Sequence, residues 1–356
     1  MTVVVSVEEM ATIAPFEPSA LLQNSLYECL VLLLNIPTIV LAAFGNALVM
    51  VSVCVEPALR EANYRILTSL SLADLLFAVL AAPLDLYSKI RLHRNSCAKP
   101  ETYFTVWSYV FAGVSFLHLA LVTTDRYLAI TRPLCYISMV TPARQFVVMS
   151  LVWLAGLAYG ISAGVNFNVI KYDNATLASY KCLGGVVNDS ASSHGGQFFV
   201  FTGSFIIGVG IFLIALNCHI LRVAVMQAQR DMRRQLMMNE ILGPRGRRPG
   251  HLAPNADTGT RHVRAVRIIL SLVAAFCLSW YPTAIRFFIS SLVDVKPATD
   301  QILQEVSYAS LKISQMVNPL IYCLRDKNFK STFCTLFPPL KRFYRTTTVH
   351  VQPGGG

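Results

Sequence analysis

The stretch SYASLKISQMVNPLIYCLRDKNFK, residues 307–330, decides how the rest of the chain is interpreted. Lys312 is surrounded by apolar residues and is the only charged residue from Ser307 to Cys323. A helix needs about 20 mostly apolar residues to cross a bilayer. A lysine inside such a helix costs roughly 2.5 to 3.5 kcal/mol on insertion scales. The stretch therefore predicts a membrane span in which something offsets the cost of Lys312.

The composition of the whole chain favours the same class of protein. Of its 356 residues, 54% are hydrophobic and 14% are charged, whereas soluble domains carry about 25% charged residues. The net charge of +11 does not indicate a nucleic-acid partner, because the basic residues lie between and after apolar spans. The nine cysteines show no metal-ligand spacing, and a disulfide framework is not expected.

Seven segments are long and apolar enough to span a membrane, near residues 26–55, 64–90, 103–130, 146–165, 197–225, 263–293 and 303–323. The predicted fold class is all-α, a seven-transmembrane helix bundle followed by a short amphipathic interfacial helix within RDKNFKSTFCTLF. The predicted organisation is an extracellular tail (1–25), a seven-span domain (26–323) and an interfacial helix with a cytoplasmic tail (324–356). Within the domain, the basic loop 226–262 is predicted to be disordered, because its centre is rich in Gly, Pro and polar residues.

The distribution of Lys and Arg predicts the orientation. Sixteen lie in the connections on one side and in the C-terminal tail, against seven on the other side. The positive-inside rule places that tail in the cytosol and the N-terminus outside. The sequons at Asn174 and Asn188 agree, since both fall in the predicted outer loop after the fourth span. Residues 1–25 contain no Lys or Arg, so the first span is expected to serve as the insertion signal in the plasma membrane.

Short motifs occur in a fixed order along six spans: Gly45-Asn46, SLADLL with Asp74, DRYLAITRPL with Asp125, Trp153, FCLSWYP with Phe276, Trp280 and Pro282, and NPLIY with Asn318, Pro319 and Tyr322. With these motifs, residues 26–337 resemble the rhodopsin-like (class A) G protein-coupled receptors. The resemblance implies a receptor in the lipid bilayer, not an enzyme. It also implies a heterotrimeric G protein as partner, with arrestin and a receptor kinase as further partners.

The resemblance assigns coupling to Asp125, Arg126 and Tyr127. It implies that Arg126 is held by Asp125 at rest and meets the G protein when the sixth helix swings outward. His262 stands where many relatives have an acid that also binds the arginine. We therefore expect the resting contact of Arg126 to involve Asp125 alone.

Two prolines predict places where the helices can change shape. Pro282 has no N–H to donate and is expected to kink the sixth helix. By resemblance, Trp280 lies beneath the ligand pocket, and Asn318, Pro319 and Tyr322 form a second weak point in the seventh helix. Kinked helices of this kind are candidates for elements with two stable arrangements.

Asp74 is a carboxylate in the middle of the second span, where it needs partners or a proton. The resemblance places it beside Ser115, Ser314 and Asn318, where a sodium ion can bind. The alternative is a protonated group that serves only in polar packing.

The resemblance also implies covalent modifications. A disulfide between Cys97 and Cys182 is expected on the outer side, although Cys97 lies about one helical turn earlier than usual. Cys334, at the end of the interfacial helix, is expected to be palmitoylated. Thr346 to Thr348 follow in the tail and are candidate phosphorylation sites.

Lys312 lies seven residues before Pro319, the spacing at which opsins carry the lysine that binds retinal as a Schiff base. A lysine in an apolar pocket is a competent amine nucleophile. The usual opsin counterion positions are held here by Phe104 and Thr176, neither of which is acidic. Glu305, two helical turns from Lys312, or Asp85 in the second span could replace them.

The alternative is that Lys312 forms a salt bridge with Asp85 or Glu305 and shapes a pocket for a diffusible ligand. Arg286 would then help to bind an anionic or peptide group. Ser108 stands where amine receptors of this family carry an aspartate, so an amine held by that contact is not expected. A transporter is disfavoured, because the sequence shows neither inverted repeats nor interrupted span pairs.

Overall fold

The computed structural model describes residues 18–60, 62–94, 102–172, 193–242, 256–293, 297–325 and 327–336. They form α1 (Pro18–Val55), the 3₁₀-helix η2 (Pro57–Leu59), α2 (Ala62–Leu76), the π-helix η3 (Phe77–Ala81), α3 (Ala82–Arg94), α4 (Thr102–Thr131), α5 (Pro133–Met139), α6 (Pro142–Tyr172), α8 (Ser193–Leu242), α9 (Ala256–Leu292), α10 (Pro297–Arg325) and α11 (Lys327–Leu336). Within these ranges every regular element is helical, which confirms the predicted all-α class.

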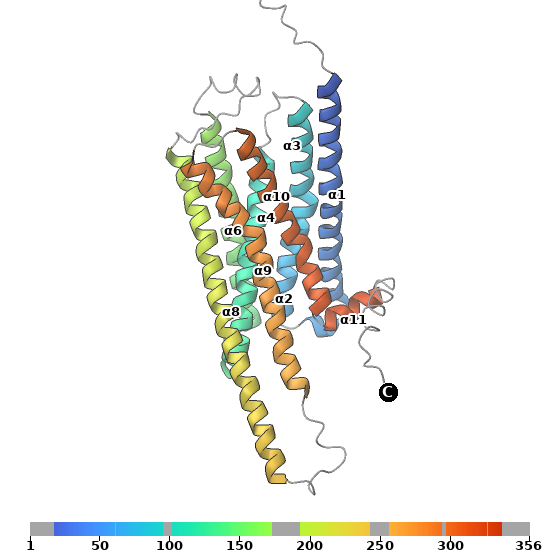
Figure 1. The fold of residues 1–356 in the computed structure, drawn as a ribbon, viewed down its shortest axis with the longest axis vertical. Coiled ribbons are helices and arrows are strands. Elements are labelled where there is room, and N and C mark those ends of the chain that lie inside the picture. Colours follow the sequence, from blue (N-terminus) through green and yellow to red (C-terminus); the bar gives the residue numbers. More distant parts are fainter. Residues whose placement is uncertain are drawn as a thin grey trace, which may run out of the picture.

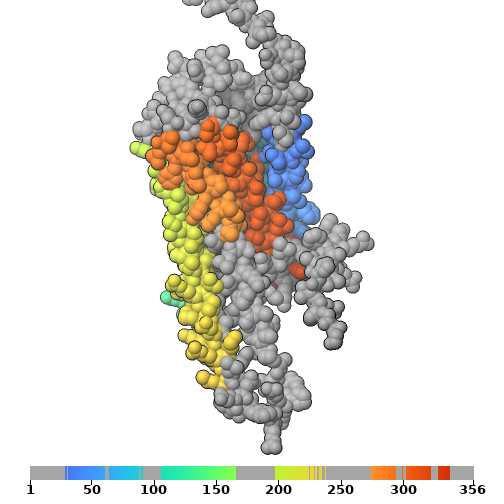
Figure 2. Space-filling view, in the orientation of Figure 1, coloured from blue at the N-terminus to red at the C-terminus, as the bar shows by residue number. Residues whose placement is uncertain are grey.

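The long helices run side by side as one bundle, in which α2, η3 and α3 follow one another as a single rod (Figure 1). The helix α11 turns away from the end of α10, as the amphipathic sequence after the last span predicts (Figure 1). Figure 2 shows α8, α9 and α10 together on one face of the molecule. Every predicted span therefore corresponds to a helical rod of the bundle.

Five helical segments of the described chain are long and apolar enough to cross a membrane: Val31–Val55, Tyr64–Tyr87, Val106–Thr131, Pro142–Val165 and Gln197–Arg234. The two remaining predicted spans lie within α9 and α10. The outside of the bundle is apolar as well, with Leu33 and Phe146 each 69% exposed and Leu278 76% exposed. Such a surface suits helices that face lipid.

Prolines mark where several helices begin. Pro18, Pro133, Pro142 and Pro297 are the first residues of α1, α5, α6 and α10. Proline suits this position because its missing N–H would have no partner inside the helix. Pro282 and Pro319 instead lie inside α9 and α10, at the points where the sequence predicts kinks.

The predicted boundaries differ from the observed ones where helices extend beyond the apolar spans. α8 continues to Leu242 and α9 begins at Ala256, so the predicted disordered loop 226–262 is helical at both ends, and residues 243–255 lie outside the described part. α1 likewise begins within the predicted tail 1–25. Arg, Gln, Met and Leu, which fill the end of α8, are good helix formers whether or not lipid surrounds them.

The π-helix η3 interrupts the second span between Asp74 and Asp85. A π-turn holds an additional residue and so turns the following side chains around the helix axis. This rotation contributes to the direction in which Asp85 points.

Glycines allow α4 and α6 to approach closely. A Cβ atom on Gly156 would lie 3.1 Å from the carbonyl oxygen of Val110, and one on Gly160 would lie 2.8 Å from that of Val106. The glycines are four residues apart and therefore share one face of α6. Small residues at this spacing are a common means of close helix packing in membranes.

Candidate functional site

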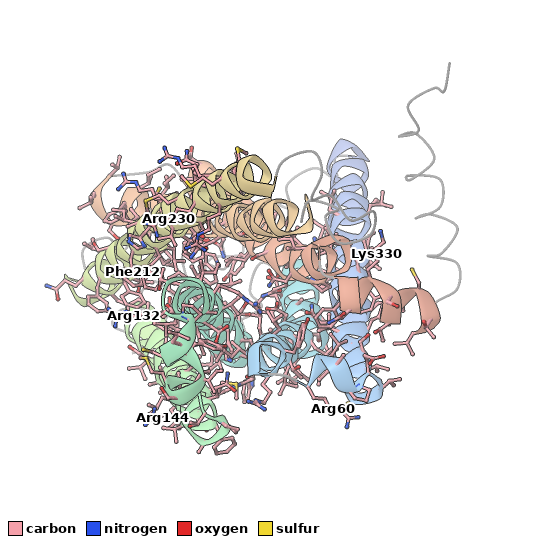
Figure 3. All side chains as sticks on the ribbon, turned by 90° about the horizontal axis from the view of Figure 1, so that it is seen from below. Arg60, Arg132, Arg144, Phe212, Arg230 and Lys330 are labelled. Atoms are coloured by element: carbon pink, nitrogen blue, oxygen red, sulfur yellow. The ribbon has the colours of Figure 1, made fainter. Side chains whose placement is uncertain are left out.

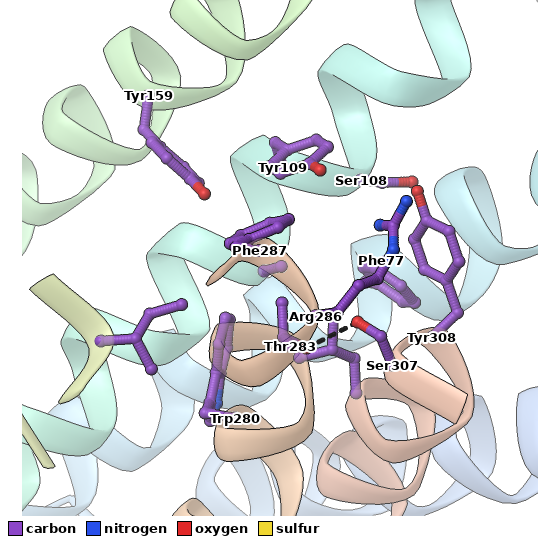
Figure 4. Close-up of a pocket in the computed structure, with 13 residues that line it drawn as sticks. Phe77, Ser108, Tyr109, Tyr159, Trp280, Thr283, Arg286, Phe287, Ser307 and Tyr308 are labelled. Carbon is purple, nitrogen blue, oxygen red and sulfur yellow. Dashed lines mark hydrogen bonds between the residues drawn. The ribbon is translucent and has the colours of Figure 1, made fainter. Parts of the chain in front are cut away.

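A small cavity lies inside the bundle between α4, α9 and α10, with further walls from η3, α6 and α8 (Figure 4). It is lined by Phe77, Ser108, Tyr109, Ala112, Tyr159, Ile206, Trp280, Thr283, Arg286, Phe287, Ser307, Tyr308 and Leu311. Its volume of about 30 Å³ is room for about two water molecules, so a larger ligand requires side chains to move. Of the predicted ligand residues, Ser108, Trp280 and Arg286 line this cavity.

Polar side chains connect α9 and α10 beside the cavity. The Ser307 hydroxyl donates to Thr283 Oγ1 at 2.8 Å, and Arg286 Nη2 donates to Gln304 Oε1 at 3.5 Å. Ser108 Oγ and Trp280 Nε1 are buried and have no hydrogen-bond partner within the described part of the chain. The cavity therefore offers polar groups that a ligand can satisfy.

The ring of Trp280 connects the cavity to the middle of the bundle. It packs edge-on against Phe116 at a centroid distance of 4.8 Å, and Phe116 lies 5.2 Å from Phe276. Pro282 follows two residues later inside α9. A displacement of Trp280 would therefore press directly on the aromatic core beneath it.

Lys312 is not among the residues that line the cavity. Its Nζ atom lies 2.5 Å from Asp85 Oδ2 and 2.5 Å from Asn35 Oδ1. Lys312 is 5% exposed and Asp85 3% exposed. Of the two acids predicted from the sequence, Asp85 is thus the one that holds the ammonium group, while Glu305 is half-buried elsewhere on α10. Asn35 carried no signal that could have identified it in advance.

Asp74 lies at a polar centre between α2 and α10. Asn318 Nδ2 donates to its Oδ2 atom at 2.8 Å, and the predicted neighbours Ser115 and Ser314 are also buried. Asp74 Oδ1 and Ser71 Oγ are buried without a hydrogen-bond partner among the described residues. A carboxylate oxygen and a hydroxyl in this state fit a small hard cation, for which oxygen atoms are the preferred ligands.

Gly45 and Asn46 fasten α1 to α10 next to this centre. Asn46 Nδ2 donates to the Gln315 carbonyl oxygen at 3.1 Å. A Cβ atom on Gly45 would lie 3.0 Å from Pro319 Cβ, so the glycine leaves room for the proline. The side chain of Tyr322 lies outside the described part.

Near the C-terminal end of α4, Arg126 Nε lies 3.9 Å from Asp125 Oδ2. The hydroxyl of Tyr136, on the short helix α5, donates to Asp125 Oδ1 at 2.7 Å. Burial, together with this hydrogen bond and the charge of Asp125, raises the pKa of Tyr136 above its usual value. Arg126 therefore contacts Asp125, as expected, and Tyr136 is a further partner of the carboxylate that the sequence did not reveal. Tyr127, of the same motif, packs against His219 of α8 at a centroid distance of 5.5 Å.

His118, a buried residue that the motifs did not identify, joins α2, α4 and α6. Its Nδ1 atom faces the Val114 carbonyl oxygen at 2.9 Å, and its Nε2 atom faces Ser69 Oγ at 2.8 Å. Trp153 Nε1 donates to Ser69 Oγ at 3.0 Å. A carbonyl can only accept, so Nδ1 carries the hydrogen and Ser69 donates to Nε2. Trp153, which the motifs had identified, is therefore part of a polar network with Ser69 and His118.

The predicted modification sites are only partly described. Cys97, Cys182, Asn174 and Asn188 lie outside the described residues. Cys334 is half-buried near the end of α11 and forms no disulfide there. The disulfide, the glycosylation and the palmitoylation remain predictions.

The described basic residues of the connections gather at the end of the bundle that carries α5 and α11. Figure 3 looks along the bundle from this end and labels Arg60, Arg132, Arg144, Arg230 and Lys330. Arg126 also lies at this end, near the C-terminus of α4 (Thr102–Thr131).

The family description "7 transmembrane receptor (rhodopsin family)" matches residues 45–322 of the 356-residue chain. The chain belongs to this receptor family. The resemblance inferred from the motifs is thereby confirmed, and with it a multi-pass membrane protein.

Three similar proteins show which kinds of receptor in the family this chain resembles. It is 28% identical to "Trace amine-associated receptor 6" of Rattus norvegicus over 82% of this chain and 80% of the relative. It is 23% identical to "Allatostatin-A receptor" of Bombyx mori over 81% and 74%, and 25% identical to "Adenosine receptor A2b" of Gallus gallus over 83% and 84%. All three are named as receptors, and none of the three names refers to retinal.

Proposed function

We propose that this receptor detects a diffusible ligand in the cavity above Trp280 and activates a heterotrimeric G protein at the end of the bundle that carries Arg126. The carrying observation is the contact between Lys312 and Asp85 at 2.5 Å, outside the cavity wall. It supports the interpretation of Lys312 as a structural ion-pair residue. The names of the three relatives support a diffusible ligand, since they refer to trace amines, allatostatin-A and adenosine.

In this proposal the ligand acts by moving Trp280. The ring contacts Phe116 and lies two residues before Pro282, so a push on it tilts α9 at its weak point. The outward movement of α9 separates Arg126 from Asp125 and makes the arginine available to the G protein. Arrestin and a receptor kinase are proposed to act at the same end. The basic residues gathered there support a cytosolic location for it, with the N-terminus outside.

Retinal on Lys312 remains a prediction from the spacing before Pro319. The contact with Asp85 suits a Schiff-base counterion as well as an ion pair, but Lys312 does not line the cavity, and this argues against retinal on its amine. We expect purified receptor treated with 11-cis-retinal to show no visible absorption band beyond that of free retinal. A band that disappears in Lys312→Ala would favour the photoreceptor function instead.

The test of the proposed function is nucleotide exchange on purified heterotrimers of each G-protein class, with the receptor in lipid vesicles. Wild type is expected to accelerate exchange on at least one class. Arg126→Ala should reduce this acceleration at least tenfold at equal receptor content. Trp280→Ala should alter the exchange rate without loss of folded protein. Equal exchange rates with wild type and Arg126→Ala would overturn the proposal.

A further inference from the structure

The helices α8 and α9 run side by side (Figure 1), and two glycines of α8 allow them to approach closely. A Cβ atom on Gly210 would lie 2.5 Å from the hydroxyl oxygen of Tyr281 and 2.8 Å from its Cε1 atom. A Cβ atom on Gly203 would lie 3.3 Å from the Ala284 carbonyl oxygen. The two glycines are seven residues, about two helical turns, apart and therefore share one face of α8. This is the face that α9 covers.

The contacts of α9 with α8 differ on the two sides of Pro282. After the proline, the backbone of the fully buried Ala284 lies against α8, and the ring of Phe287 stacks on Phe199 of α8 at a centroid distance of 5.1 Å. Before the proline, the contact at the glycine is made by the end of one half-buried side chain, that of Tyr281. Since Pro282 weakens α9 at this point, the earlier segment can move while the later segment stays against α8.

The side chain of Tyr281 lies beside the segment that precedes Pro282. Cα–Cβ bonds in an α-helix tilt toward the N-terminus, and the Tyr281 side chain accordingly forms a hydrogen bond with that of Cys277, one turn earlier. The preceding residue, Trp280, lines the cavity. The two side chains are about 100° apart around the helix axis. A displacement of Trp280 that turns α9 therefore also moves Tyr281 away from Gly210.

We infer that Tyr281 is a positioning residue for the change of conformation, whose ring packs against Gly210 and holds α9 in its resting arrangement. The ring leaves this position when α9 moves outward. The space beside Gly210 holds the end of the ring and leaves no room for a further methyl group. Tightly packed contacts of this kind change between discrete arrangements and do not deform continuously. The inference rests on the proposed function and adds the contact that stabilises the resting receptor.

Gly210→Ala tests the inference, because it adds one methyl group where the end of the Tyr281 ring lies. The basal rate of nucleotide exchange, without ligand and at equal receptor content in lipid vesicles, is expected to rise at least threefold. Gly208→Ala is the matched control on the same helix and should leave the basal rate unchanged, since a Cβ atom there meets nothing within 4 Å. Gly203→Ala should lower the thermal midpoint but change the basal rate less than twofold, because its contacts lie after Pro282.

Tyr281→Leu separates this contact from a general loss of packing. Leucine lacks the outer ring atoms that lie against Gly210, so the variant should itself raise the basal rate. Adding Gly210→Ala to Tyr281→Leu should change neither the basal rate nor the thermal midpoint further, whereas independent effects would add.

Equal basal rates for wild type and Gly210→Ala would overturn the inference, as would an equal rise in Gly203→Ala or additive effects in the double variant. Where Gly210→Ala does not fold, the basal rate of Tyr281→Leu decides, and an unchanged rate overturns the inference. These outcomes differ from a failure of the proposed function, in which wild type accelerates exchange no more than Arg126→Ala does.

Discussion

Lys312 on α10 and Asp85 on α3 form an ion pair in which Nζ lies 2.5 Å from Oδ2, with the two side chains only 6% and 4% exposed. The Asn35 side-chain oxygen, from α1, accepts a second hydrogen bond from the same ammonium. A buried charge is tolerated when it is paired and its hydrogen bonds are satisfied. The contact thus offsets the cost of a lysine in a membrane span and joins three helices.

Removing one partner of this pair should destabilise the receptor strongly. Lys312→Met and Asp85→Asn should each lower the free energy of unfolding by about 3 to 5 kcal/mol, because each leaves the other group buried without its partner. The double variant should recover a large part of the loss. A double-mutant cycle on detergent-purified receptor measures this coupling.

Glu305→Gln is the matched control, since it neutralises the other acid that the sequence offered as a partner of Lys312. It should show no coupling to Lys312→Met. Coupling of Glu305→Gln equal to that of Asp85→Asn would show that the ion pair is assigned to the wrong acid.

Asp74 provides a second prediction, on sodium. The unpartnered Oδ1 atom of Asp74 and the hydroxyl groups around it are expected to bind Na⁺. Replacing choline chloride by sodium chloride at equal ionic strength should raise the thermal midpoint of wild type by a few degrees. Asp74→Asn should remove the response, and Ser314→Ala should weaken it. A sodium response that persists in Asp74→Asn would place the ion elsewhere.

Tyr136→Phe should raise basal nucleotide exchange. The hydroxyl holds Asp125 at 2.7 Å, and without it the carboxylate positions Arg126 less firmly. A hydrogen bond to a charged group contributes about 1.5 to 3 kcal/mol, and since about 1.4 kcal/mol is a factor of ten, the increase should be about tenfold or more. Ile137→Ala, on the exposed face of the same helix, should leave the stability of the receptor unchanged.

The hydrogen bond between Tyr136 and Asp125 also predicts that the effect of Tyr136→Phe on basal exchange does not depend on pH near neutrality. The pKa of Tyr136 is raised above its usual value of about 10, so the contribution of the neutral hydroxyl is fully present below that value. It is lost only as the pH rises through the higher pKa of the folded state. The ratio of basal exchange between wild type and Tyr136→Phe should therefore be constant from pH 6 to pH 9. A ratio that changes within this range would assign the effect to another group.

The parts of the site that the sequence predicted are those set by local pattern. The length of the apolar segments predicts the membrane spans. The missing N–H groups of Pro282 and Pro319 predict where α9 and α10 are weakened. Sequence spacing alone could not decide whether Asp85 or Glu305 pairs with Lys312. The pairing depends on the rotation that the π-helix η3 introduces before Asp85 and on the position of Asn35 in a distant helix. Tyr136 was missed for the same reason, since its contact depends on how α5 folds back against α4.

The packing of α4 against α6 gives the last prediction, in which one substitution has opposite effects at two glycines. A Cβ atom on Gly160 would lie 2.8 Å from the Val106 carbonyl oxygen and 2.9 Å from the Val110 nitrogen, so Gly160→Ala must push the helices apart. Such overpacking should destabilise the receptor by about 1 to 3 kcal/mol. A Cβ atom on Gly208 of α8 would meet nothing within 4 Å, and Gly208→Ala should leave stability equal or raise it by up to about 1 kcal/mol. Thermal unfolding of both variants decides the matter, and destabilisation by both would mean that the effect comes from glycine flexibility and not from the contact between α4 and α6.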